Sequence, residues 1–328
     1  MIQSEVAEIV AVADSVPEHA AAAAHLVSAA VANSLDELLD AKLDGLVIAT
    51  PSALHANQAI AALERRVAVF CQKPLARTAM ETAAVVEAAR QADRLLGVDL
   101  SYRFVEGARR IRQLVRAGEL GSVYAVDLVF HNAYGPDKPW FYDPALSGGG
   151  CVIDLGIHLI DLALWTLDQV VVHQVSSHLF ARGEPLGNRT DLVEDFAFAE
   201  LELAGGMMAR LACSWNLPTG CDAVIQASFF GTKGGAMLSN LNGSFYDFTA
   251  DRFRGTSRER LCAPPDHWGG RAIVDWATQL SRGAGFDPSA DRLVDVAAVV
   301  DAIYGREGLP LPRPLRKPGF VLASVGTS

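Results

Sequence analysis

The first hundred residues of the chain alternate short apolar runs with helix-length segments, and this alternation constrains the fold more than any other feature. The apolar runs occupy residues 6–13, 45–49, 67–71 and 95–100. A strand that is apolar throughout needs cover on both of its faces, and helices between parallel strands supply that cover. The sequence therefore predicts an α/β fold with a doubly wound parallel sheet.

Two capping boxes mark helix starts within this region. Ser34 is followed three residues later by Glu37, and Thr78 is followed in the same way by Glu81. In each pair, the hydroxyl of the first residue can accept a hydrogen bond from the backbone N–H of the second, which stabilises the first helical turn. We therefore expect helices to begin after Ser34 and after Thr78.

The alternation ends near Arg103, where we place a domain boundary. After a basic helix at residues 107–116, apolar runs follow one another with glycine turns between some of them, as is typical of antiparallel hairpins. These runs occupy residues 123–130, 170–180, 196–203, 207–215, 223–230 and 236–241. We expect an α/β domain over residues 1–103, an α+β domain with a large, mostly antiparallel open-faced sheet over residues 104–308, and a proline-rich tail over residues 309–328.

The composition restricts the partners that the protein can bind. The formal net charge is −10, whereas surfaces for nucleic acid or anionic membrane need clustered Lys and Arg, so we expect neither partner. The five cysteines are widely spaced and form no Cys-x-x-Cys pair, which is typical of thiols in a reducing compartment. We find no apolar run that approaches the length of a membrane span and no signal-peptide pattern. The sequence therefore predicts a soluble cytoplasmic protein.

The stretch over residues 148–161 carries the clearest chemistry. It opens with three glycines, which tolerate close approach by bulky groups. Asp154 and His158 follow on a helix expected over residues 154–167, and their four-residue spacing predicts that they lie on one face. A carboxylate beside an imidazole is suited to acid/base catalysis. The same pair could begin a metal site, but no third ligand is evident, and we expect no metal.

The N-terminus lacks one element that a dinucleotide-binding sheet normally has. Such a sheet begins with a strand and a Gly-x-Gly-x-x-Gly turn, and this pattern does not occur near the N-terminus. The first predicted strand instead ends in Asp14, the kind of acid that ends the second strand of such sheets. We expect that the first strand, which would lie in mid-sheet, is missing. A start codon assigned too late is the explanation that we favour, with truncation and a degenerate paralogue as alternatives.

Four groups of residues give the chain a resemblance to the Gfo/Idh/MocA family, the relatives of glucose-fructose oxidoreductase and inositol dehydrogenase. They are Thr50-Pro51 with His55, Gln72-Lys73-Pro74, Tyr102-Arg103-Phe104, and residues 148–161. The resemblance implies a Rossmann-type dinucleotide-binding domain followed by a domain for substrate binding and oligomerisation. It also implies an NAD- or NADP-dependent dehydrogenase that acts on a CH–OH group of a sugar, polyol or related small molecule, assembled as a homodimer or homotetramer through the C-terminal sheet.

The resemblance implies that Lys73, Asp154 and His158 are catalytic. Lys73 would stand at the carboxyl end of a strand and stabilise the reacting oxygen. His158 would act as general acid/base, and Asp154 would orient the imidazole or bind a substrate hydroxyl. Asp161 would make a structural bond near the domain junction. The glycines of the stretch would let substrate and nicotinamide approach.

The resemblance also implies cofactor contacts. They fall on Asp14, Thr50, Pro51, His55, Gln72, Lys73 and Pro74. Asp14 would hold the adenosine ribose hydroxyls and repel a 2′-phosphate, which favours NAD over NADP. Family members usually carry Glu where this chain has Gln72. For His55 there is an alternative interpretation, as a solvent-facing residue in the first turn of a helix.

Substrate contacts are expected from aromatic and polar side chains. They are Tyr102, Arg103, Trp140, Phe141, Asp154 and His158. Aromatic rings stack on sugar faces, although Trp140 and Phe141, which lie in a proline-rich loop, could instead anchor that loop.

Two other functions compete with the dehydrogenase. One is a non-catalytic regulatory paralogue that binds a sugar or nucleotide through a degenerate cofactor site, which the missing glycine turn favours. The other is a dimerisation scaffold, which would leave Lys73, Asp154 and His158 unexplained.

Overall fold

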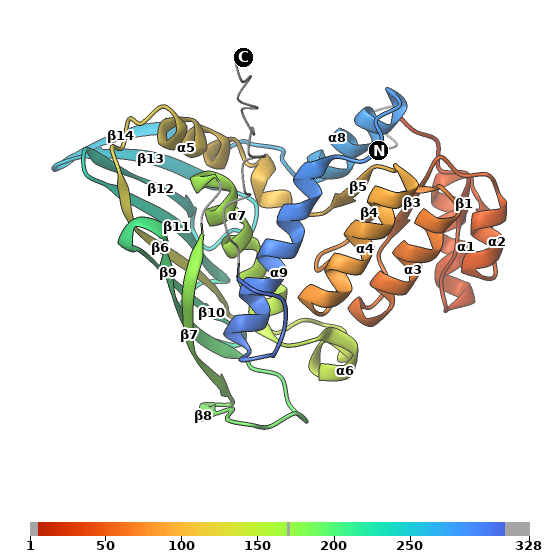
Figure 1. Ribbon diagram of the computed structural model, residues 1–328, viewed down its shortest axis with the longest axis horizontal. Coiled ribbons are helices and arrows are strands. Elements are labelled where there is room, and N and C mark those ends of the chain that lie inside the picture. Colours follow the sequence, from red (N-terminus) through yellow and green to blue (C-terminus); the bar gives the residue numbers. More distant parts are fainter. Residues whose placement is uncertain (1–5, 169–170, 312–328) are drawn as a thin grey trace, which may run out of the picture.

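The computed structural model describes residues 6–168 and 171–311, so most of the predicted tail lies outside the described residues. The chain forms two regions that lie side by side: helix-covered short parallel strands, and one large sheet (Figure 1). The strands of the first region are β1 (Ala11–Val12), β2 (Ala30–Val31), β3 (Gly45–Ile48), β4 (Ala68–Cys71) and β5 (Leu96–Val98); its helices are α1 (Pro17–Val27), α2 (Leu35–Asp40), α3 (Ser52–Glu64) and α4 (Ala79–Ala92). The predicted fold class is confirmed.

The parallel strands form two separate sheets. β1 pairs with β2, while β3, β4 and β5 form a three-stranded sheet, and no ladder joins the two sheets within the described residues. β1 covers only part of the strand predicted at residues 6–13, and β2 is not among the strands that the sequence predicts. Val10 and Val31 are 46% and 44% exposed, so their side chains gain little from burial. Longer strands at β1 and β2 would therefore be stabilised only weakly.

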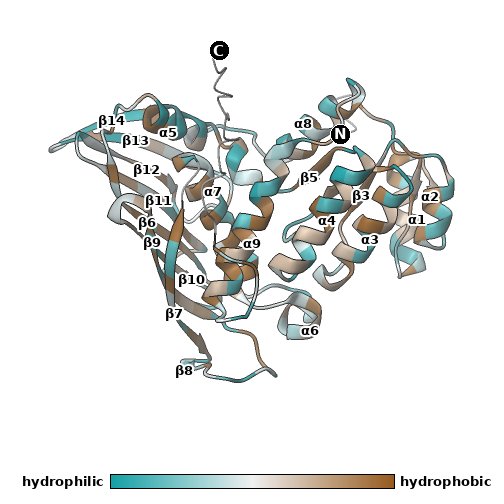
Figure 2. Ribbon diagram, viewed as in Figure 1, coloured by the Kyte–Doolittle hydropathy of each residue, from teal (hydrophilic) through white to brown (hydrophobic). Residues whose placement is uncertain are grey.

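Both predicted helix caps are present. Ser34 Oγ accepts from the Glu37 N–H at 3.1 Å, and Thr78 Oγ1 accepts from the Glu81 N–H at 3.1 Å. Each glutamate carboxylate reaches the backbone N–H of the residue before the cap, so a second backbone donor is satisfied. The helices that follow carry both hydrophilic and hydrophobic residues (Figure 2), as expected where one face meets a sheet and the other meets water.

The second region is organised around a nine-stranded sheet in the order β14-β13-β12-β11-β6-β10-β9-β7-β8. Its strands are β6 (Val123–Asn132), β7 (Val172–Ala181), β8 (Glu184–Pro185), β9 (Phe196–Leu203), β10 (Met207–Ser214), β11 (Ala223–Gly231), β12 (Gly234–Asn240), β13 (Phe248–Arg254) and β14 (Ser257–Cys262). Among the described pairs, β6 with β10 is parallel and the others are antiparallel. The predicted mostly antiparallel sheet is therefore confirmed.

β13 and β14 are not among the strands that the sequence predicts, because charged residues interrupt the apolar pattern of β13 and make up much of β14. Asp251 of β13 is fully buried and pairs with Arg258 and Arg260 of β14, at 2.6 Å in each case. These pairs across the two strands compensate the buried charge of Asp251. Ion pairing thus helps to hold the edge strand β14 against β13.

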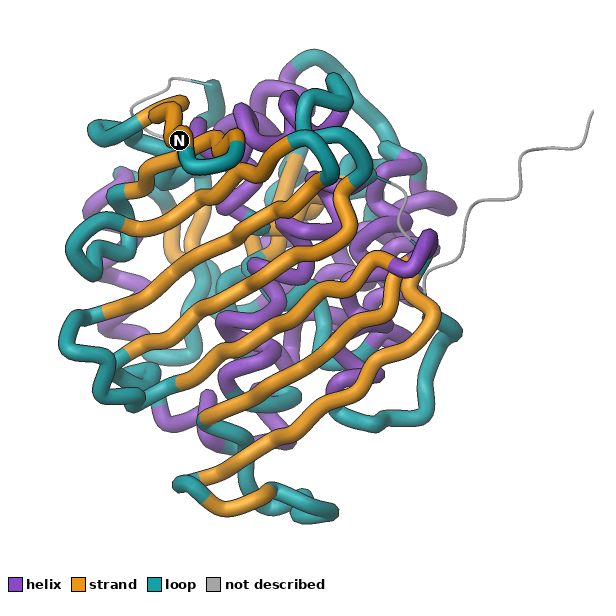
Figure 3. Tube along the Cα trace, turned by 90° about the vertical axis from the view of Figure 1, so that its left-hand side faces the viewer, coloured by secondary structure: helices purple, strands orange, loops and turns teal. Residues whose placement is uncertain are grey.

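Helices cover one face of the large sheet. α5 (Glu106–Arg116), α7 (Ile157–Leu167) and α9 (Asp291–Ile303) pack there, and α7 is buried between the sheet and its neighbours. Figure 3 views the opposite face, with the strands in front and the long helices behind them. α8 (Arg271–Ser281) packs instead against β4 and β5 of the first region, through Trp276.

The apolar segment that contains α7 corrects one expectation from the sequence. From α6 (Pro144–Ser147) to Leu167 it is long and apolar enough to span a membrane, with a mean hydropathy of 1.6. In the folded chain 83% of its most apolar window is buried, and its helix α7 lies in the core of the second region.

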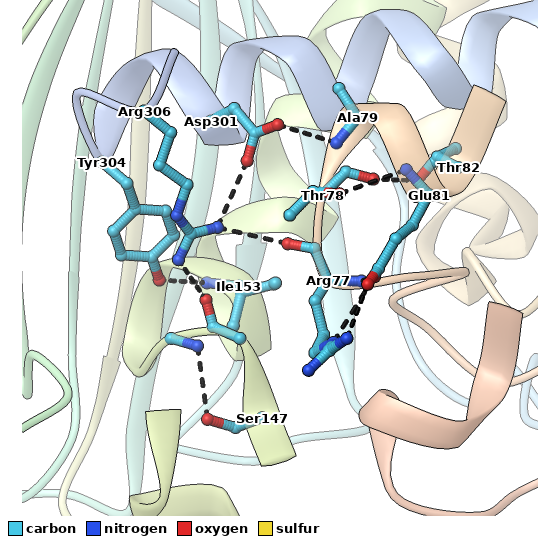
Figure 4. A network of polar contacts seen from close by, with 12 residues as sticks. Arg77, Thr78, Ala79, Glu81, Thr82, Ser147, Ile153, Asp301, Tyr304 and Arg306 are labelled. Carbon is cyan, nitrogen blue, oxygen red and sulfur yellow. Dashed lines mark hydrogen bonds and ion pairs between the residues drawn. The ribbon is translucent and has the colours of Figure 1, made fainter. Parts of the chain in front are cut away.

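A polar network ties α9 to the start of α4 (Figure 4). Asp301 Oδ2 accepts from the Ala79 N–H at 2.7 Å, and Asp301 Oδ1 accepts from Arg306 Nη1 at 3.2 Å. Arg306 also donates to the backbone carbonyls of Arg77 and Gly148. Asp301 is 4% exposed, so these bonds form away from water and fix the two regions against each other.

Asp301→Ala tests this junction. The substitution leaves the buried Ala79 N–H without a partner, so we expect the free energy of unfolding to fall by about 1–3 kcal/mol. The control is Asp291→Ala on the same helix, because Asp291 pairs with Arg90 at the surface. That change should cost about 0–1 kcal/mol in the same urea titration. Equal effects of the two substitutions would contradict a stabilising junction.

Candidate active site

Lys73 and Asp154 meet between the two regions. Lys73 lies two residues after β4, and Asp154 lies shortly before α7. The Lys73 Nζ donates to Asp154 Oδ1 at 2.5 Å and to the Asp154 backbone oxygen at 2.6 Å. The side chains are 17% and 13% exposed, so the pair is largely shielded from water. An ammonium group carries three N–H bonds, and the third remains for a ligand oxygen.

Trp215 holds the other side of the Asp154 carboxylate, and sequence reasoning missed it. Its Nε1 donates to Asp154 Oδ2 at 3.0 Å. Trp215 directly follows β10 and is buried, and its only sequence signal is a position at the end of an apolar strand, which many core residues share. Both carboxylate oxygens are engaged, and Asp154 makes no hydrogen bond to His158 in the described chain. This corrects the expectation that Asp154 orients the imidazole.

A π-helical turn explains why Asp154 and His158 do not pair. The helix expected over residues 154–167 starts as the π-helical turn Val152–Gly156, in which the Ile157 N–H bonds to the Val152 oxygen five residues earlier. The four-residue stacking of an α-helix therefore does not hold here. Single π-helical turns within helices are frequent at functional sites.

His158 is a buried imidazole whose Nδ1 has no hydrogen-bond partner in the described chain. Its ring centroid lies 5.0 Å from that of Tyr102. Burial, and to a smaller extent the Lys73 charge, holds the pKa of His158 well below its ordinary value. Burial therefore favours the neutral form of the imidazole, because it disfavours the charged form. Leaving a buried polar atom unpartnered costs about 1–3 kcal/mol, a cost that a bound ligand would remove.

His55 links the loops that follow β3 and β4. Its Nδ1 lies 2.7 Å from the Pro74 oxygen, and its Nε2 lies 2.7 Å from the Thr50 oxygen. The ring is buried, so the alternative in which His55 faces solvent is wrong. Burial lowers the pKa of His55 in spite of the two carbonyl contacts. His55 thus fixes the loop of Thr50 and Pro51 against the loop of Pro74.

The other expected cofactor residues also lie at the carboxyl ends of parallel strands. Asp14 follows β1 and is 43% exposed, and its Oδ1 accepts from the Val16 N–H at 2.8 Å. Gln72 follows β4, and its Nε2 donates to Asp99 Oδ2 at 2.8 Å. Ligands of parallel sheets bind at this edge. The cofactor contacts stay predictions, in positions that suit them.

The aromatic residues expected on the substrate side pack beside His158 and beside Trp215, the residue that holds Asp154. Tyr102 is buried, and its ring packs against His158 and three further rings. Those rings are Phe130, Phe248 and Trp268. Trp140 stacks on Phe141 with centroids 3.8 Å apart, and the Phe141 ring meets Trp215 edge-on at 6.4 Å. The proline-rich loop therefore packs beside the residue that holds Asp154.

Arg103 is engaged in a buried ion pair rather than open to substrate. Its Nε donates to Asp161 Oδ2 at 2.7 Å, and its Nη2 donates to Asp161 Oδ1. Asp161 is 1% exposed and needs a counter-charge, which the guanidinium supplies. The structure thus gives Asp161 the structural bond expected of it and corrects the substrate role expected of Arg103.

The three glycines at residues 148–150 pack against protein. A Cβ at Gly150 would overlap the backbone oxygen of Glu194, and a Cβ at Gly149 would overlap the Tyr304 hydroxyl. This corrects the expectation that the glycines make room for substrate and nicotinamide. They allow Glu194 to approach the turn that leads to Asp154.

Glu194 is a buried carboxylate that sequence reasoning missed, because its partners are distant in sequence. It accepts from the N–H groups of Gly150 and Val152, at 2.9 Å and 2.8 Å. It also accepts from the Tyr304 hydroxyl at 2.7 Å. Burial raises the pKa of Glu194, which these hydrogen bonds oppose. Glu194 therefore fixes the start of the π-helical turn.

Known protein families match both regions of the chain. A family described as "Oxidoreductase family, NAD-binding Rossmann fold" matches residues 1–100, and one described as "GFO/IDH/MocA C-terminal domain" matches residues 108–237. The two matches follow each other in the order of the two regions.

Curated relatives and solved structures are similar over much of the chain. The D-glucoside 3-dehydrogenase of Escherichia coli strain K12 is 30% identical over 61% of this chain and 60% of its own length. The inositol 2-dehydrogenase 3 of Saccharopolyspora erythraea is 30% identical over 71% of this chain and 65% of its own length. The match thus spans less than two thirds of these relatives. Levoglucosan dehydrogenase, solved with NADH and levoglucosan, has the same fold, with a TM-score of 0.76 at 22% identity over 90% of this chain and 86% of its own.

Arg103→Met tests the buried ion pair. The substitution leaves the Asp161 carboxylate buried and unpaired, so we expect the free energy of unfolding to fall by about 3–5 kcal/mol. The double variant Arg103→Met, Asp161→Leu removes both charges and should be more stable than the single variant. Urea titrations of the three proteins measure both effects. A loss below about 1 kcal/mol in the single variant, typical of surface pairs, would contradict a structural role.

Proposed function

Because the chain belongs to the GFO/IDH/MocA family of oxidoreductases, we propose that it transfers a hydride between a sugar, polyol or related hydroxyl substrate and a nicotinamide cofactor. One observation carries this proposal. The Lys73 ammonium, held by Asp154, keeps one N–H for a ligand, and its charge acts on the buried imidazole of His158. A hydrogen-bond donor and a neutral proton acceptor at one site suit the oxidation of an alcohol.

Lys73 and His158 act on the same substrate hydroxyl. His158 accepts the hydroxyl proton, because burial keeps its imidazole neutral. Lys73 donates its remaining N–H to the substrate oxygen and stabilises the negative charge that develops there. Asp154 and Trp215 keep the ammonium in place. In the reverse reaction His158 returns the proton to the oxygen.

NAD is the cofactor that we propose. When bound, it supplies the hydride acceptor. The residues that would hold it are Asp14, Thr50, Pro51, Gln72, Lys73 and Pro74, in the loops that follow the parallel strands, and His55 of α3 would keep two of these loops in place. The unpartnered Nδ1 of His158 fits a site that a ligand completes. The acid at Asp14 would bind ribose hydroxyls and disfavour a 2′-phosphate, which supports NAD over NADP.

The names of the two relatives support a sugar or polyol as substrate, since one acts on a D-glucoside and the other on inositol. Trp140 and Phe141 lie beside Trp215, which holds Asp154, and aromatic rings can stack on the faces of such molecules. The buried Tyr102 ring instead supports His158 from within the core. The guanidinium of Arg103 is not part of this proposal, because it is paired with Asp161.

We also propose a cytoplasmic homodimer or homotetramer that forms through the outer face of the nine-stranded sheet. Phe198 of β9 and Met208 of β10 are 50% and 40% exposed, and Figure 3 shows the strands of this sheet in front of the long helices. The five cysteines are free thiols, as expected in a reducing compartment. Light scattering coupled to size-exclusion chromatography gives the oligomeric state.

Turnover of Lys73→Met and His158→Gln tests the mechanism. NADH absorbance is followed with NAD and a panel of sugars and polyols. Lys73→Met should lower kcat about 100–1,000-fold, because one preorganised donor to the substrate oxygen is lost. His158→Gln should lower kcat about 100–10,000-fold, because the proton acceptor is lost.

The matched control is Lys42→Met, because Lys42 is exposed and precedes β3 at the opposite edge of the sheet. It should leave kcat unchanged. Wild-type turnover that persists in both active-site variants would contradict the mechanism. Binding of NADH and a sugar without turnover of any panel member would support the regulatory alternative.

A further inference from the structure

Asp99 lies at the same sheet edge as Lys73 and has no role in the mechanism above. The register of β4 and β5 pairs Cys71 with Val98, and the Asp99 N–H donates to the Cys71 oxygen at 2.9 Å. Backbone pairing therefore places Asp99 beside Gln72. The Gln72 Nε2 donates to Asp99 Oδ2 at 2.8 Å, so the carboxylate is also tethered by its side chain.

The charge of Asp99 acts within the catalytic site. Burial raises the pKa of Asp99, and the Gln72 hydrogen bond and the Lys73 charge oppose that shift. Lys73 directly follows Gln72, so this hydrogen bond holds the Asp99 carboxylate at the same sheet edge as the Lys73 ammonium, although no ion pair joins Lys73 and Asp99 within the described residues. The other Asp99 oxygen, Oδ1, makes no hydrogen bond within the described residues. A partly buried carboxylate with one side-chain hydrogen bond lowers the stability of the fold, so stability alone does not explain the presence of Asp99.

We propose that Asp99 is a positioning residue for the reaction, which places a second negative charge beside Lys73 and keeps the ammonium available as a donor to the substrate oxygen. The uncharged side chain of Gln72 holds the Asp99 carboxylate in place through its hydrogen bond. Its amide can donate to the carboxylate, whereas a second acid at this position would repel Asp99. This inference rests on the proposed dehydrogenase function.

Substitutions at Gln72 and Asp99 can distinguish the effect of the Asp99 charge from the effect of the hydrogen bond between the two side chains. Asp99→Asn keeps the shape and leaves two amides that can still bond to each other, so only the charge is lost. Gln72→Glu with Asp99→Asn returns one carboxylate and one amide, with their positions exchanged. Asp44→Asn is the control, because Asp44 is exposed and precedes β3 at the far edge of the sheet.

Steady-state kinetics distinguish a charge effect from a structural one. We expect Asp99→Asn to lower kcat about tenfold with little change in KM for NAD, because one charge near the ammonium is removed. The exchanged double variant should recover most of kcat, and Asp44→Asn should retain it. Unchanged kcat in Asp99→Asn, or a loss that the exchange does not restore, would overturn the proposal.

A second measurement does not depend on turnover. Acetic anhydride modifies lysine amines, and peptide mass spectrometry gives the rate at Lys73. Removing a negative charge favours the reactive neutral amine, so Asp99→Asn should speed the modification of Lys73 and the exchange should slow it again. An unchanged rate would overturn the Asp99 inference. If Asp99→Asn changes the rate of Lys73 modification but the protein turns over no substrate, the coupling between Asp99 and Lys73 is supported. The proposed dehydrogenase function is then rejected.

Discussion

The ion pair between Lys73 and Asp154 is the contact on which the rest of the site depends. Both groups are largely shielded from water, and shielded charges are stable only when they are paired and hydrogen-bonded. The lysine belongs to the first region, because it follows β4, and the aspartate belongs to the second region, because it precedes α7. The ion pair therefore joins the two regions at the site.

A second set of contacts holds the turn that presents Asp154. Glu194 binds the backbone of Gly150 and Val152, and Tyr304 donates to Glu194 from the end of α9. Arg306, two residues further, donates to the Gly148 carbonyl and to Asp301, which caps α4. The chain of bonds runs from the π-helical turn that contains Asp154 to α4, the helix that follows Lys73. Both ends of the ion pair are thus supported by the same network.

The sequence predicted what short-range patterns determine. The caps at Ser34 and Thr78 depend on residues three positions apart, and the apolar strands β3 and β4 depend on their own residues. It did not predict β13 and β14, whose pairing depends on the buried charge of Asp251. Trp215 and Glu194 were missed because their partners lie tens of residues away. The prediction that Asp154 and His158 stack on one face of an α-helix was wrong, because the chain forms a π-helical turn between them.

Burial of His158 has two consequences: it lowers the pKa of the imidazole, and it leaves Nδ1 without a hydrogen-bond partner in the described chain. The environment that packs the ring against Tyr102 keeps the imidazole neutral, which a proton acceptor requires, and leaves Nδ1 without a partner in the described chain. Exposure to water would restore a hydrogen bond and raise the pKa toward its ordinary value, so the neutral base would be partly lost. Stability and reactivity are therefore opposed at this residue. A ligand that hydrogen-bonds to Nδ1 would remove this cost. The unpartnered Nδ1 of His158 is therefore a better indication of a binding site than the position of His158 on the helix.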